Sequence, residues 1–114
     1  MSLLGKTEDV LVELINLETK RIKDHERIIK IYPPNNPATV ENQNLKAQAQ
    51  IARNHYNVML KTMERIRREC KSQVLFQCEE QFRQALLALN QCRNDRNKIG
   101  LAEQIINGIY NRAR

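Results

Sequence analysis

The segment YPPNNPAT, residues 32–39, contains all three prolines of the 114-residue chain and decides where the first helix ends. Proline lacks the backbone N–H that a helix needs, and it disfavours the helical conformation in the residue before it. We therefore expect a helix to end at Tyr32 and a loop to occupy residues 33–38. Thr39 is a suitable N-cap for the next helix, and Glu41 places a negative charge in its first turn, where the helix dipole favours it.

Residues 7–32 carry side chains at a spacing that predicts a long helix. One sevenfold series consists of Ile15, Ile22 and Ile29. A second series with the same spacing lies between them and consists of Leu11, Glu18, His25 and Tyr32. Alternating steps of three and four residues keep one stripe on one face of an α-helix, where a partner helix packs.

Residues 39–71 predict a second long helix for the same reason. Two sevenfold series interleave there: Leu45, Ala52, Met59, Ile66 and Ala49, Tyr56, Met63, Cys70. A strand would instead alternate apolar and polar residues at every second position, and this pattern does not persist in any window.

The apolar pattern changes phase after the second helix. Steps of four residues join Cys70, Val74 and Cys78, which indicates either an unwound continuous helix or a break. We expect a turn at residues 70–73, because one continuous helix would find no antiparallel partner of its own length in this chain.

A third helix is predicted for residues 73–111. Its polar segment, residues 93–100, leaves open whether it is broken there and a short fourth helix follows Gly100. The sequence therefore predicts an all-α fold: an antiparallel bundle of three long helices with coiled-coil-like packing. Residues 1–114 form a single domain in this interpretation, and a domain of this size can also belong to a longer protein.

Cys78 and Cys92 are the residues that most resemble a chemical site, and we predict that they are core residues. They are fourteen positions apart, which separates them by roughly 21 Å along a helix. A disulfide needs Cα atoms within about 7 Å, and structural zinc sites use cysteine pairs two to four residues apart. An odd total of three cysteines fits a reducing compartment, so we expect an intracellular protein of the cytoplasm or nucleus.

The sequence predicts no enzyme, no cofactor and no metal. Glu18 and His25 lie one heptad apart, but general acid–base catalysis also needs a cleft and a positioned substrate. His25 and His55 are too few ligands for a metal site. Three glycines leave little room for phosphate-binding loops. No apolar run is long enough for a membrane span.

The net charge of +6 and a pI of about 9.5 favour contact with an acidic partner. Two basic groups recur at helical spacing and are candidates for contact with nucleic acid or an acidic protein: Lys20, Lys23, Arg27, Lys30 and Lys61, Arg65, Arg68, Lys71. Acidic residues interrupt both groups, and no known nucleic-acid-binding motif accompanies them.

Apolar residues beyond the main stripes are candidates for self-association, although they can also widen the intrachain core. These residues are Ile51, Val58, Leu101, Ile105, Ile109 and Tyr110. The sequence therefore favours a non-enzymatic protein–protein interaction module, such as a scaffold, adaptor or complex subunit. Its candidate partners are an unidentified protein or a second copy of the chain, and a nucleic-acid-associated helical module is the alternative.

Overall fold

The computed structural model describes residues 2–114 and confirms the all-α, bundle-like fold. The helices follow one another along the chain in this order: α1 (Leu3–Ile31), α2 (Pro37–Glu69), α3 (Ser72–Gln77), α4 (Glu79–Gln91), the short 3-10 helix η1 (Arg96–Lys98) and α5 (Ile99–Ala113).

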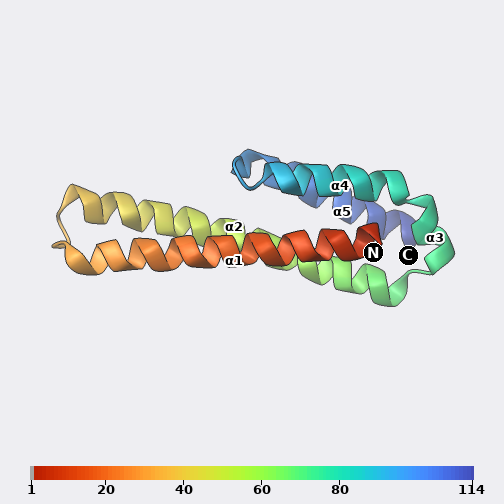
Figure 1. Ribbon diagram of the computed structural model, residues 1–114, viewed down its shortest axis with the longest axis horizontal. Coiled ribbons are helices and arrows are strands. Elements are labelled where there is room, and N and C mark those ends of the chain that lie inside the picture. The colour runs from red at the N-terminus through yellow and green to blue at the C-terminus, as the bar shows by residue number, and fades with distance from the viewer. Residues whose placement is uncertain (1) are drawn as a thin grey trace.

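The helices form two antiparallel hairpins of different length (Figure 1). α1 and α2 run along most of a molecule that measures 57 × 22 × 21 Å. The shorter α4–α5 hairpin covers only the half of α1–α2 that lies near the chain ends, with α4 packed on α1 and α5 packed on α2. We call this half the base. The other half of the long hairpin, residues 22–50, projects beyond α4 and α5, and we call it the arm.

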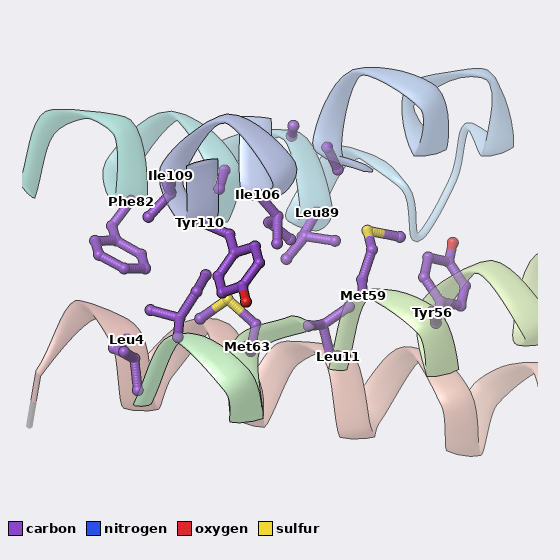
Figure 2. Packing of buried hydrophobic residues seen from close by; sticks show 14 of the residues in the cluster. Leu4, Leu11, Tyr56, Met59, Met63, Phe82, Leu89, Ile106, Ile109 and Tyr110 are labelled. Carbon is purple, nitrogen blue, oxygen red and sulfur yellow. The ribbon is translucent and has the colours of Figure 1, made fainter. Parts of the chain in front are cut away.

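The hydrophobic core lies in the base, where all four of these helices meet (Figure 2). Its largest apolar side chains come from every helix of the two hairpins and include Leu11, Leu14, Tyr56, Met59, Met63, Ile66, Phe82, Leu89, Ile106 and Ile109. The predicted stripes of the first two helices therefore face this core over the length that α4 and α5 cover.

In the arm, polar contacts join the two helices beside a narrow apolar seam that includes the buried Ile22 and Ala49. The side-chain nitrogen of Asn42 donates to the Ala38 carbonyl at 2.8 Å, so its oxygen faces His25 Nδ1, also at 2.8 Å. Because an amide oxygen only accepts, Nδ1 of His25 carries a proton. The Thr39 hydroxyl donates to the Pro33 carbonyl at 2.8 Å. These bonds satisfy polar groups that lie between the two helices of the arm.

The proline loop ends α1 as predicted, but the start of α2 differs from the prediction. Asn36, not Thr39, is the N-cap, and its side chain accepts from the Ala38 N–H at 2.9 Å. Pro37 occupies the first helical position, where its missing N–H costs nothing. α1 also begins earlier than predicted, at Leu3, because Ser2 caps it by accepting from the Gly5 N–H at 3.0 Å.

The predicted turn after the second helix is present, and the third helix is divided. Cys70 and Lys71 are extended, with ψ angles of 141° and 143°. The polar segment between α4 and α5 does break the helix, since Asp95 caps η1 by accepting from the Asn97 N–H at 3.0 Å. α5 begins at Ile99, so Gly100 lies inside this helix and does not precede it. The third long helix is thus replaced by a short hairpin.

Candidate interaction surfaces

A groove with a mainly apolar lining lies at the end of the base, where α3 passes the first turn of α1. We call it the base groove. Its apolar lining consists of Leu3, Leu4, Cys70, Leu75, Phe76 and Phe82. Its polar lining consists of Ser2, Arg67, Ser72 and Glu79. Arg67 is paired with Glu8, and Glu79 with Arg83. The charged groups of the groove therefore have partners, and apolar surface is what the groove offers a ligand.

The base groove arises because α2 ends at Glu69, although apolar residues continue along the chain beyond it. After Glu69 the chain bends, and the six residues of α3 include no buried side chain. Leu75 is half-buried, whereas Phe76 is 77% exposed. Exposed apolar area is unfavourable by about 25 cal/mol per Å². Aromatic side chains are enriched at protein interfaces, where burial recovers this free energy.

The eight basic candidate residues are all exposed, but the structure does not bring the two groups together. Glu26 pairs with Lys46 at 4.0 Å, which places the first basic group beside the start of α2. Arg68 lies 22 residues beyond Lys46 on α2, or roughly 33 Å along the helix. Arg65 also bonds to Glu69 and Tyr110. The basic residues thus form two small patches, one that runs from the edge of the base into the arm and one on the base.

The self-association candidates are also separated. Ile109 and Tyr110 are buried in the core, so the expectation that they are free for a second chain is corrected. Glu103 lies 3.3 Å from His55 of α2, and a two-residue step turns a helix by about 200°. Leu101 therefore points away from α2 and is exposed, whereas Ile105 is half-buried and packs against the core.

Ile51 and Val58 remain exposed on α2 as a separate apolar strip. The tip of the arm exposes three further apolar residues that sequence reasoning did not single out as a surface, namely Ile31, Tyr32 and Val40.

The cysteines lie where the sequence placed them, with one exception. Cys78 and Cys92 are buried, while Cys70 is half-buried and lines the base groove. All three are free thiols. Burial raises the pKa values of Cys70 and Cys92, which lowers the fraction of reactive thiolate at neutral pH.

We expect an aromatic disulfide reagent to modify one thiol per folded chain and all three in denaturant. Cys70 is the reactive one, because Cys78 and Cys92 become accessible only on opening of the core. Absorbance of the released thiolate measures both the number and the rate. Cys70→Ser should remove the reaction in the folded protein. A second thiol that reacts equally fast in the folded protein would contradict the burial of Cys78 and Cys92.

A buried ionic cluster joins the two hairpins at the boundary between base and arm. The Glu18 carboxylate, 1% exposed, accepts two bonds from Arg96, both at 2.8 Å, and one from Arg21 at 2.8 Å. Burial by itself raises the pKa of Glu18, but the hydrogen bonds and charges of Arg96 and Arg21 outweigh it and hold that pKa below its usual value. Glu18 does not pair with His25, which bonds to Asn42.

Arg96 could not be identified as a site residue from the sequence, which shows it only as part of a polar segment between two apolar stretches. The pairing with Glu18 spans 78 positions and exists only once the α4–α5 hairpin has folded back. The cluster has a structural role, because the charged groups of Glu18, Arg21 and Arg96 are directed at one another.

Comparison of the chain with protein-family models, with curated proteins and with solved structures finds no match. Among residues 2–114, no helix combines the length and hydropathy of a transmembrane span. Within the same residues, no group of three or more His, Cys, Asp or Glu side chains is placed to hold a metal ion.

Proposed function

We propose that the chain is a non-enzymatic protein–protein interaction module, of the kind found in scaffolds, adaptors and complex subunits. It binds an apolar segment of a partner protein in the base groove. The observation that supports this proposal is the exposure of Phe76 beside a groove whose charged residues are already paired.

The chemistry of the groove favours an amphipathic helix as the partner segment. Such a helix presents apolar side chains at steps of three and four residues, and it satisfies its own backbone hydrogen bonds. It therefore needs apolar contacts from the groove and few polar ones. Phe76 is the expected anchor, because aromatic residues at the centre of an interface often contribute most of the binding free energy.

Photo-crosslinking tests this proposal. We expect p-benzoylphenylalanine at position 76 to trap a discrete partner protein in cells. The purified partner should then bind the wild-type chain, and Phe76→Ala should weaken binding at least about tenfold. Because Phe76 is exposed, the same change should leave the melting temperature nearly unaltered.

Leu87 provides the matched control, since it is 61% exposed on α4 and does not line the base groove. A crosslinker at position 87 should not trap the same protein, and Leu87→Ala should leave its binding unchanged. An identical crosslinked species at both positions, or undiminished binding by the Phe76→Ala variant, would refute the proposed groove.

The alternative function is contact with nucleic acid through the basic residues. The exposure of all eight residues favours it. Two separate patches would contact fewer phosphates at once than a single continuous one, and each contact contributes to affinity through released counterions. We therefore rank this function second.

A further inference from the structure

The connection between α2 and α3 is short and contains no residue that forbids a helix. There is neither glycine nor proline between Pro37 and Gly100. In the connection between α2 and α3, Cys70 and Lys71 leave the helical conformation, and both have negative φ angles, −101° and −76°. A change of ψ at these two residues is enough to convert the bend into a helix, since both the extended and the helical regions are open to them.

Straightening the bend would also satisfy additional backbone groups. The Lys71 carbonyl now accepts from the N–H groups of Val74 and Leu75, both at 3.0 Å, so α3 begins a new set of helical bonds. In a continuous helix the N–H groups of Lys71, Ser72 and Gln73 would each bond to the carbonyl four residues earlier. The bent form is therefore favoured by the docking of the α4–α5 hairpin and not by the linker itself.

The α4–α5 hairpin docks on α1–α2 through side chains. Its contacts are the shared apolar core, the Glu18–Arg96 pair and the hydrogen bond from Arg65 to Tyr110 at 2.7 Å. None of these contacts requires that both hairpins belong to the same chain. A second copy can supply the same hairpin, as in other exchanged dimers.

The direction of the helices allows such an exchange. α4 runs antiparallel to α2 on the base (Figure 1). If the linker straightens, α3 continues α2 past the base, and α4 follows in the same direction once Cys78, the break between α3 and α4 at φ −96° and ψ 13°, also becomes helical. In a second copy whose base faces that of the first, this α4 would run antiparallel to the α2 of the second copy. This is the direction that α4 has relative to α2 in the single chain. Two such exchanges related by a two-fold axis close the assembly.

We propose that the chain forms a dimer in which two copies exchange their α4–α5 hairpins, with residues 70–71 and the α3–α4 junction at Cys78 acting as the hinge that straightens. This inference does not depend on the function proposed for the base groove. It has a consequence for that groove, however, because Cys70, Leu75 and Phe76 lie on the hinge or shortly after it. Exchange would therefore change the shape of the base groove.

Ser72→Pro tests the hinge and leaves the bent chain intact. Ser72 is the first residue of α3, a position that suits proline, and the extended Lys71 is the conformation that proline prefers in the residue before it. In a straight helix the same proline would lie in the interior, where it removes a hydrogen bond and clashes with the preceding turn. Ser72→Ala is the matched control, because alanine permits both forms.

The expected result is that wild type and Ser72→Ala, refolded from urea at high protein concentration, yield a species of twice the 13.4 kDa chain mass by light scattering. This dimer should persist for hours after dilution, since its release requires the hairpins to undock. Ser72→Pro should remain monomeric with wild-type helicity.

Dimers made from one isotope-labelled and one unlabelled copy identify the exchange directly. We expect nuclear Overhauser effects between α1 of one copy and α4 of the other. A wild-type chain that stays monomeric, a dimer that separates at once on dilution, or a dimer without these intermolecular signals would overturn the proposal. The isotope experiment uses wild type alone and stays decisive if Ser72→Pro fails to fold.

Discussion

Ile109→Asp is expected to unfold most of the protein. Ile109 is 1% exposed in the core between the two hairpins (Figure 2). Loss of its apolar side chain alone is destabilising by roughly 2–5 kcal/mol. Burial of an unpaired carboxylate adds several kcal/mol more. A domain is usually stable by only about 5–15 kcal/mol, so the folded state loses most or all of its margin. Circular dichroism and urea unfolding measure the effect.

Leu101→Asp is the control on the same helix. Leu101 is 46% exposed and points away from the core, so its replacement should change the free energy of unfolding by no more than about 0.5 kcal/mol. Ile109→Val should fold with a loss of about 0.5–1.5 kcal/mol. Wild-type folding of Ile109→Asp together with unfolding of Leu101→Asp would contradict the burial of Ile109 and the exposure of Leu101 on α5.

The sequence predicts the long hairpin well because its signals are local. The prolines of residues 32–39 end one helix by their own covalent structure, and the heptad spacing of each long helix needs only its own residues. The turn at Cys70 is readable from a phase change in the apolar pattern. These features do not depend on which segments later meet in space.

The rest of the fold depends on contacts between distant segments, which a single sequence does not encode in any short pattern. Ile105 and Ile109 look alike in the sequence, yet only Ile109 is fully buried, because α5 turns one flank toward the core. Asn36 does not stand out as a cap in the sequence because Thr39 is an equally suitable residue type. The burial of Phe82 and the exposure of Phe76 likewise result from how α3 leaves the end of α2.

Glu18→Gln is expected to lower the free energy of unfolding by about 3 kcal/mol at neutral pH. The change keeps the size of the side chain but leaves the guanidinium groups of Arg96 and Arg21 without a counter-charge in a partly buried site. Removing one member of a buried ion pair typically costs about 3–5 kcal/mol, and the partial exposure of both arginines places this cluster at the lower end. Glu13→Gln, at an exposed pair with Arg93, should cost less than about 1 kcal/mol.

The cluster should also make stability depend on pH in a defined direction. The pKa of Glu18 is lower in the folded protein than its ordinary value of 4.5, so the unfolded chain binds a proton more readily. The stabilisation is therefore complete above the unfolded pKa and is lost as pH falls through the folded pKa. Urea unfolding between neutral and strongly acidic pH should show a steeper acid loss for wild type than for Glu18→Gln. Parallel curves for the two proteins would mean that the Glu18–Arg96 pair does not hold the α4–α5 hairpin on α1, because a carboxylate bound by two arginines must lose that contribution on protonation.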